Sequence, residues 1–439
     1  MVVPAFDQHH RPERALVDEC VHCGFCLPSC PTYLLWGEEM DSPRGRIHLV
    51  GQALDGAPLT STMVEHFDRC LGCLACVTAC PSGVRYDRLI ETVRGQVERR
   101  HRRPLAERAL RRAVFALFPY RRRLRLLAGP LRTYQRLGLA RLARRSGLLD
   151  RLPAPLAAME RLLPQVPEAH RLPGHLPAVG RRRAVVGLLV GCVQSVFFPE
   201  VNAATARLLA AEGCDVVIPP DQGCCGALSR HAGRDAQARR LARRTVDVFE
   251  RGGVDAVVVD AAGCGSAMKD YAELLADDPR YAARAAALAG QVRDLSELLV
   301  ELGPVAPRRP LALSVAYHDA CHLAHAQNVR AAPRQLLAGV PELQVGEVDE
   351  PDICCGSAGV YNLLQPEAGA ALGRRKAGHV LRSGADVVVT ANPGCAMQIA
   401  AAAGELGRGV TVVHIAQVLD ASLRGLEPAA LTGAGPSCP

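Results

Sequence analysis

Two short runs of cysteine constrain the fold of this chain more than any other feature of its sequence. Both runs have the spacing C-x2-C-x2-C-x3-C and are followed by proline. Three thiolates spaced three residues apart can bind three irons of one cubane, while the following chain carries the fourth cysteine to the other cluster. The runs therefore predict two [4Fe–4S] clusters that exchange one ligand each. The first cluster is assigned Cys20, Cys23, Cys26 and Cys80, and the second Cys70, Cys73, Cys76 and Cys30.

Zinc is the alternative occupant of these cysteines. Zinc sites usually take four ligands from two separated pairs, whereas two identical four-cysteine runs ending in proline are typical of paired clusters. The chain between the runs is longer than a minimal two-cluster ferredoxin needs, and Leu59–Phe67 and Arg88–Arg100 have helical patterns. We therefore expect a helical ferredoxin-like domain over residues 1–93 that carries one electron at a time.

The cysteine content is high for the compartment that the sequence indicates. Among 439 residues, no apolar stretch approaches the roughly 18 residues of a membrane span, and the start lacks the apolar run of a signal peptide. We therefore expect a cytoplasmic protein, or one bound peripherally to the cytoplasmic face of the inner membrane. Disulfides are rare in the cytosol, so metal binding is the first explanation for 18 cysteines.

The last part of the chain contains an internal repeat. The order Cys, Cys-Cys-Gly, Cys occurs twice, and matching cysteines are 129 to 131 residues apart. Strand-like runs such as Ala184–Val190 and Val254–Val259 alternate with helical patterns such as Val201–Glu212. This alternation predicts parallel sheets covered by helices, with the cysteines at strand ends, where such sheets bind ligands. We expect two α/β lobes, over 181–305 and 306–439, related by a pseudo-twofold axis.

The cysteines of the repeat are further candidate metal ligands. They are Cys192, Cys224, Cys225 and Cys264 in the first copy, and Cys321, Cys354, Cys355 and Cys395 in the second. Their matched spacing is poorly explained as core packing, whereas free buried thiols explain Cys214 and Cys438, which lie outside the repeat. Both Cys-Cys-Gly lobes could hold further iron–sulfur centres, although the sequence leaves open whether the lobes hold metal at all.

Histidines and arginines lie near both groups of cysteines. His318 and His322 flank one repeat cysteine, and His325 follows. They could tune or replace a ligand, although histidines in such places more often cap a strand or bind backbone. Arg44 and Arg46 lie between the two N-terminal runs, where they could neutralise cluster charge or belong to a solvated loop.

Residues 94–180 form an arginine-rich helical linker in a chain of the α+β multidomain class. Leu105–Phe118 has helical spacing. A second amphipathic stretch, Leu124–Leu149, is expected to break at Gly129-Pro130, and the prolines from 153 to 177 indicate an extended linker.

The charge of this linker admits three interpretations. Between Arg94 and Arg183 the chain has 23 arginines and five acidic residues. A basic amphipathic helix can lie on an anionic membrane, dock an acidic partner or bridge domains. Docking and membrane contact rank above nucleic acid, because the segment is leucine-rich and shows no known nucleic-acid-binding fold.

Tandem ferredoxin-type runs joined to two Cys-Cys-Gly repeats resemble the family of glycolate oxidase iron–sulfur subunits. The segments 23–28, 42–47 and 391–395 carry the specific likeness. Iron–sulfur subunits of anaerobic glycerol-3-phosphate dehydrogenase and cysteine-rich subunits of heterodisulfide reductase are similar as well. The reductase domains have a further cysteine where this chain has Ala261 and Asn392, which disfavours disulfide chemistry here.

The resemblance implies an electron-transfer subunit of an oxidoreductase complex. A separate FAD subunit would oxidise glycolate to glyoxylate, and this chain would pass the electrons to a quinone or another acceptor. We expect no catalytic residue and no organic-cofactor site on this chain, because it has neither G-x-G-x-x-G after a strand nor a P-loop. The alternatives are a subunit of a glycerol-3-phosphate or D-lactate dehydrogenase, and a metal-binding redox sensor without a catalytic partner.

Overall fold

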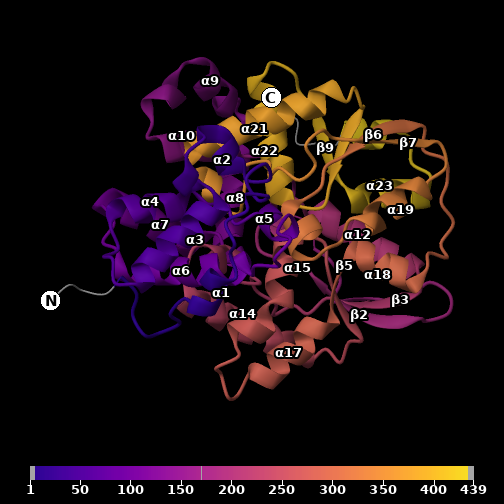
Figure 1. The fold of residues 1–439 in the computed structure, drawn as a ribbon. Coiled ribbons are helices and arrows are strands. Elements are labelled where there is room, and N and C mark those ends of the chain that lie inside the picture. Colours follow the sequence, from indigo (N-terminus) through magenta and orange to yellow (C-terminus); the bar gives the residue numbers. More distant parts are fainter. Residues whose placement is uncertain (1–4, 170, 434–439) are drawn as a thin grey trace.

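Two sheets organise the chain from residue 175 onward, and the N-terminal helices pack beside them (Figure 1). The computed structural model describes residues 5–169 and 171–433, so Cys438 lies outside the described residues. The first sheet has the order β1-β3-β2-β4-β5 and the second β7-β6-β8-β9. Only β1, which pairs with β3, is antiparallel to its neighbour among these strands. The strands are β1 (His175–Leu176), β2 (Ala184–Leu189), β3 (Cys214–Val217), β4 (Ala256–Val259), β5 (Val292–Asp294), β6 (Leu313–Tyr317), β7 (Leu343–Glu347), β8 (Val387–Thr390) and β9 (Thr411–His414).

The central strands are buried because helices cover both faces of each sheet. All four residues of β4 and of β8 are buried, and most are valine, as expected for parallel strands. In the second sheet, Val315 of β6 lies opposite Val345 of β7 on one side and Val387 of β8 on the other. The prediction of parallel sheets with covering helices is confirmed. The helices of the first lobe are α11 (Gln194–Phe197), α12 (Pro199–Ala211), α13 (Ala227–His231), α14 (Asp235–Glu250), α15 (Ala262–Lys269), α16 (Tyr271–Leu274), α17 (Ala282–Gln291) and α18 (Leu295–Leu302).

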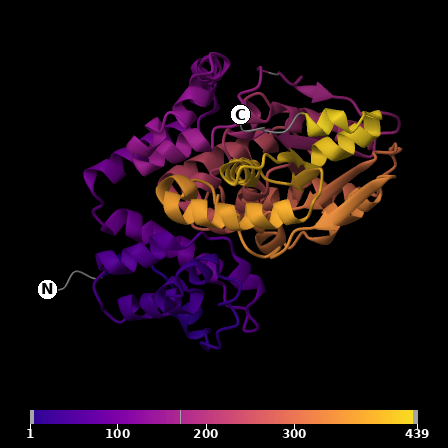
Figure 2. The ribbon, with the colours of Figure 1, turned by 90° about the horizontal axis from the view of Figure 1, so that it is seen from above.

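The two lobes share one apolar core. Buried side chains of β2, β3 and α12 belong to the same cluster as those of β6, β8, β9 and α23. Helix α12 packs on α23, where Arg207 binds Asp420 at 2.6 Å. The lobes therefore form one continuous body, as seen from above in Figure 2. The second lobe contains a π-helical turn (His322–Ala326), α19 (Ala331–Ala338), α20 (Tyr361–Leu364), α21 (Pro366–Arg382), α22 (Pro393–Glu405), α23 (Ile415–Arg424) and α24 (Ala429–Thr432).

The N-terminal part is helical, as expected. Its central helix starts at Ser42, whose side chain accepts a hydrogen bond from the Gly45 N–H. A Cβ at Gly45 would lie 2.0 Å from the carbonyl oxygen of Glu39, so only glycine allows the close packing of this helix on the preceding turn. The helices are α1 (Arg14–Asp18), α2 (Pro31–Trp36), η1 (Glu39–Asp41), α3 (Pro43–Leu54), α4 (Ser61–Arg69), α5 (Ala75–Thr78) and α6 (Tyr86–Arg100).

The linker differs from the expectation in two places. Helix α8 continues through Gly129-Pro130 and ends before Gly138, which adopts φ +71°. Pro130 is tolerated because this side of the helix is exposed, so the carbonyl that its ring displaces can turn toward solvent. The predicted extended stretch from Pro153 is wrong at its start, because α10 forms there with Pro155 in the first turn, where an N–H is not needed. The helices are α7 (Leu105–Leu117), α8 (Arg121–Arg136), α9 (Leu139–Arg145), η2 (Leu148–Arg151) and α10 (Ala154–Arg161).

Candidate metal centres

The structure gathers the cysteines of the first run, except the last, around one small cavity. The cavity measures about 30 Å³, and its sulfur-bearing walls are Cys20, Cys23, Cys26, Cys76 and Cys80. The loop between the cysteines curves tightly because His22 and Gly24 both have positive φ. The cavity thus brings Cys80 of the second run to three cysteines of the first.

Cys30 of the first run lies instead with the cysteines of the second run. Its thiol is 3.3 Å from the Thr32 hydroxyl and 3.6 Å from the Asp41 carbonyl oxygen. Burial raises the pKa of Cys76, and the thiols of Cys73, Cys70 and Cys30 raise it further. Cys76 therefore borders both groups, which places the two groups side by side.

Two arginines favour the thiolate form at the centre of the second group. Burial raises the pKa of Cys70, but Arg46 and Arg94 more than offset it, together with hydrogen bonds from the Tyr86 hydroxyl and the Gly72 N–H, so that the pKa is lowered. Those two bonds measure 3.6 and 3.3 Å. Thiolate is the form that binds metal. The donor set here, sulfur with nearby positive charge, fits an anionic iron–sulfur cluster.

Arg46 is fully buried, so the interpretation of this arginine as part of a solvated loop is wrong. Its guanidinium donates to the His66 carbonyl oxygen at 2.6 Å and to the Asp41 carbonyl oxygen at 2.5 Å. The Asp41 carboxylate has no exposed surface and also contacts His66 and Arg69, each at 2.9 Å. This network lies close to Cys70 and Cys30 of the second group and holds the loop between the two runs. Arg44 remains partly exposed, paired with Glu39 at 2.6 Å.

The repeat cysteines form a quartet in each lobe. In the first lobe, the sulfurs of Cys192 and Cys224 are 3.5 Å apart, and Cys264 lies in the first turn of α15 next to Cys225. In the second lobe, the sulfurs of Cys321 and Cys354 are 3.8 Å apart. Each quartet lies where strand ends, the Cys-Cys-Gly turn and a helix start meet, the sheet edge at which open α/β sheets place ligands.

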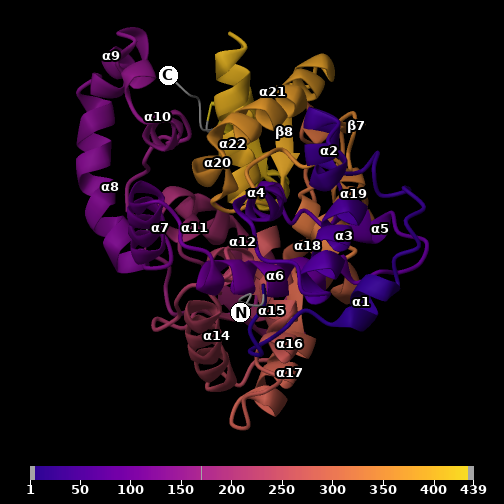
Figure 3. The ribbon, with the colours of Figure 1, turned by 60° about the vertical axis from the view of Figure 1, so that its left-hand side comes forward.

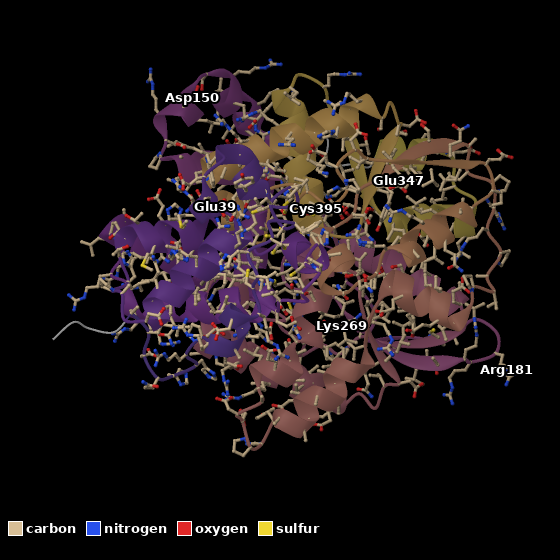
Figure 4. The ribbon with its side chains drawn as sticks, viewed as in Figure 1. Glu39, Asp150, Arg181, Lys269, Glu347 and Cys395 are labelled. Atoms are coloured by element: carbon tan, nitrogen blue, oxygen red, sulfur yellow. The ribbon has the colours of Figure 1, made fainter. Side chains whose placement is uncertain are left out.

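A histidine lies beside two cysteines of the second quartet. The ligand atoms of His318, Cys355 and Cys395 all lie within 4.8 Å of one another, and all three residues are buried. Cys354 and Cys395 lower the pKa of Cys355 despite burial, and His318 adds to this shift. Figure 4 labels Cys395 near the centre of the molecule, between the N-terminal helices and the second sheet.

A mostly apolar cavity of about 130 Å³ lies between the two quartets. Its wall includes cysteines of both lobes, together with His231 and His322, whose rings are 4.7 Å apart. The Ala262 N–H donates to the Ala391 carbonyl oxygen at 3.0 Å and so joins the two lobes beside this cavity. A small molecule here would be close to sulfurs of both lobes.

The second lobe holds the N-terminal part through the histidines that follow Cys321. The His322 ring bonds the Gly72 carbonyl oxygen at 3.0 Å, and the His325 ring bonds the Thr78 hydroxyl at 3.0 Å. Both rings also follow the more common interpretation of such histidines, binding to backbone, because the His325 ring bonds the Asp352 carbonyl oxygen at 3.2 Å as well. Burial lowers the pKa of His322 to about 4, so this ring is neutral at pH 7.

This docking brings the N-terminal and repeat cysteines together, which the sequence did not predict. Cys73 shares one apolar cluster with Cys354 and Tyr361, and the Tyr361 hydroxyl donates to the Arg69 carbonyl oxygen at 2.9 Å. Burial raises the pKa of Cys73, and Cys321 raises it further. The only sequence feature that pointed to this contact was the group of histidines beside Cys321.

Matches to family models cover most of the chain. A model described as "4Fe-4S dicluster domain" matches residues 16–84, and one described as "Cysteine-rich domain" matches 186–269 and 315–400. A third, described as "Glycolate oxidase iron-sulfur subunit, linker region", matches 106–163. Most of the basic linker therefore matches a family model of its own.

Two curated relatives match along nearly the full length of the chain. The probable glycolate oxidase iron–sulfur subunit of Bacillus subtilis is 41% identical over 91% of this chain and 92% of that protein. The glycolate oxidase iron–sulfur subunit of Escherichia coli is 35% identical over 93% and 95%. Lactate utilization protein A of an Exiguobacterium strain is 31% identical, but over 54% of this chain and 98% of its own length. A crystal structure of a hypothetical protein from Helicobacter pylori has a similar fold, with a TM-score of 0.53 at 10% identity, covering 89% of this chain and 70% of that one.

Proposed function

This chain belongs to the family of glycolate oxidase iron–sulfur subunits, and from that premise we propose that it relays electrons from a separate FAD subunit, which oxidises glycolate to glyoxylate, toward a quinone or another acceptor. The observation that carries this proposal is the contact between the two N-terminal cysteine groups, which Cys76 borders on both sides. Groups this close support one-electron transfer between adjacent centres. The chain contributes no catalytic residue of its own to the proposal.

The ligand sets of the relay follow from the two groups. Cys20, Cys23, Cys26 and Cys80 would hold one [4Fe–4S] cluster, and Cys30, Cys70, Cys73 and Cys76 the other. When bound, such clusters accept and release single electrons. The Arg46 and Arg94 guanidiniums stabilise negative charge at the second group, and Arg44 lies beside the first. In the first lobe, the all-sulfur quartet is a candidate for a further iron–sulfur centre.

The two ends of the relay differ in their surroundings. At the first group Cys23 is exposed, and the neighbouring Val21 and Phe25 are 69% and 67% exposed. Exposed apolar side chains beside a redox group suit docking of the flavin subunit. The second group is buried against the second lobe, near the cavity between the quartets. We therefore place electron entry at the first group and exit toward that cavity.

The lobes fit an internal duplication. Both sheets contain four parallel strands in the same order, β3-β2-β4-β5 and β7-β6-β8-β9, and the "Cysteine-rich domain" model matches once in each half. On this basis we divide the chain into a ferredoxin-like domain (1–93), a linker (94–180) and two cysteine-rich domains (181–305 and 306–439).

Anaerobic purification of the native complex tests the proposed relay. We expect the chain to elute with a flavin-containing subunit, to absorb visible light as brown iron–sulfur proteins do, and to hold roughly eight irons and as much acid-labile sulfide from its N-terminal part. The measurement is iron, sulfide and flavin per chain, with mass spectrometry of the partners. A colourless chain, or zinc bound at the two N-terminal groups, would contradict the proposal.

The linker offers a surface for a membrane that carries a quinone. No helix in 5–169 or 171–433 is long and apolar enough to cross a membrane. Helices α8 and α9 instead form an outer edge of the molecule (Figure 3). Leu126 on α8, Leu137 just after α8 and Leu142 on α9 are 77%, 68% and 64% exposed among exposed arginines. Exposed leucine beside arginine is the pattern of a helix that lies in the interface of an anionic bilayer.

We expect the chain to float with anionic vesicles and not with neutral ones. The double variant Leu126→Glu/Leu142→Glu should bind about a hundredfold more weakly, because each of the two leucines withdrawn from lipid loses roughly 1.5 kcal/mol. The measurement is flotation against vesicle concentration. Val305→Glu, at a position that is 64% exposed in another part of the surface, is the matched control and should float normally. Equal flotation of the double variant and wild type would rule this surface out.

A further inference from the structure

Among the residues that the structure describes, a buried histidine beside the second quartet has no hydrogen-bond partner for its ring. His318 is 1% exposed. Within the described residues, neither of its ring nitrogens has a hydrogen-bond partner of normal geometry. A buried polar group without a partner is costly, so such a group in a folded protein calls for a ligand. The sulfurs of Cys355 and Cys395 lie within 4.8 Å of a ring nitrogen.

The ligand atoms of these three residues are close enough together to bind one metal ion. His318, Cys355 and Cys395 place their ligand atoms within 4.8 Å of one another, close enough to bind the same centre at metal–ligand distances of about 2.0 to 2.3 Å. A fourth ligand is at hand, because the sulfurs of Cys321 and Cys354 lie 3.8 Å apart beside this group. One nitrogen and three sulfurs form the Cys₃His set of structural zinc sites.

The corresponding place in the first lobe is different. Leu189 precedes Cys192 by three residues, as His318 precedes Cys321, and Leu189 packs in the apolar core. The first quartet therefore has only sulfur, and the histidine is specific to the second lobe. The two quartets are chemically distinct despite their matched spacing.

A second feature supports an anionic metal centre in the second lobe. Lys376 of α21, one of two lysines in the chain, is 1% exposed and donates to the carbonyl oxygens of Asp349 and Glu350 at 3.3 and 2.6 Å. Burial lowers the pKa of Lys376, and the negative charges of Cys355, Cys354 and Cys395 oppose this shift. Three thiolates and a divalent cation leave one negative charge, which this ammonium would balance.

We propose that the second lobe binds one Zn²⁺ ion through His318, Cys355, Cys395 and one thiolate of the Cys321–Cys354 pair. The ion would tie the end of β6 to the Cys-Cys-Gly turn and to the start of α22. The segment between β6 and α19 also carries His322 and His325, which hold the N-terminal part. The site would thus fix the surface on which the N-terminal cysteine groups are seated.

Metal analysis of the full chain, purified without oxygen from zinc-containing medium, tests this site. We expect about one zinc per chain in wild type and its loss in His318→Leu, which installs the residue of the first lobe. His322→Leu is the matched control, because this ring bonds backbone, and it should keep the zinc. His318→Cys should keep the zinc as well, because a fourth sulfur can replace the nitrogen. Wild type without zinc, or His318→Leu with undiminished zinc, overturns the proposal.

Zinc K-edge X-ray absorption of wild type tests the ligand set even if a variant fails to fold. It reports zinc alone, whatever iron the chain holds. We expect one nitrogen near 2.0 to 2.1 Å with sulfurs near 2.3 Å, and in His318→Cys sulfur only. A sulfur-only shell in wild type overturns the role of His318. The outcome is independent of the proposed relay, which is tested by the iron of the N-terminal groups and by the flavin-containing partner.

Discussion

Replacing Cys80 with alanine is expected to abolish the cluster of the first run, although Cys80 belongs to the second. The reason is the cavity that Cys80 shares with Cys20, Cys23 and Cys26. A cubane that loses one of four thiolates in an exposed site is labile, so iron should fall from roughly eight to about four per chain, with an equal loss of sulfide. Iron analysis and electron paramagnetic resonance of the reduced chain measure the loss.

The resonance that each variant loses shows which cysteines bind the same cluster. Cys80→Ala and Cys20→Ala should lose the same signal, whereas Cys30→Ala and Cys70→Ala should lose the other. Cys214→Ala is the control, because this buried cysteine lies in the apolar core, away from both groups, and it should keep all the iron. If Cys80→Ala and Cys70→Ala instead lost the same signal, each run would hold its own cluster and the exchange of ligands would be wrong.

Local spacing in the sequence predicted the elements of the fold better than their contacts. The cysteine runs and the alternation of strands and helices depend on neighbours within a few residues, and the expected strand Ala184–Val190 is confirmed as β2. The bond from His322 to Gly72 joins residues 250 positions apart, and no local pattern encodes such a pairing. The break expected at Pro130 is wrong for a related reason, since tolerance of proline depends on which side of α8 faces solvent.

The two arginines of α3 also show that local sequence patterns do not reveal tertiary contacts. Sequence alone cannot distinguish a buried arginine from an exposed one two residues away. Arg44 is paired with Glu39 at the surface and lies close enough to Cys26 to be affected by its charge. Arg46 is buried among Thr32, Asp41 and the His66 carbonyl, next to Cys70 and Cys30. The two residues therefore face different cysteine groups, and the same substitution at each position separates their roles.

Arg46→Met is expected to destabilise the cluster-loaded chain by roughly 3 kcal/mol, because it leaves the buried Asp41 carboxylate short of one partner while His66 and Arg69 remain. Arg44→Met should cost no more than about 1 kcal/mol, since its ion pair is partly exposed. Removing a cation disfavours an added electron, so Arg46→Met should lower the potential of the second cluster, and Arg44→Met that of the first by less. Anaerobic denaturant unfolding and redox titration followed by paramagnetic resonance measure both effects. A shift of the first potential in Arg46→Met, with the second unchanged, would show that the buried guanidinium acts on the other group.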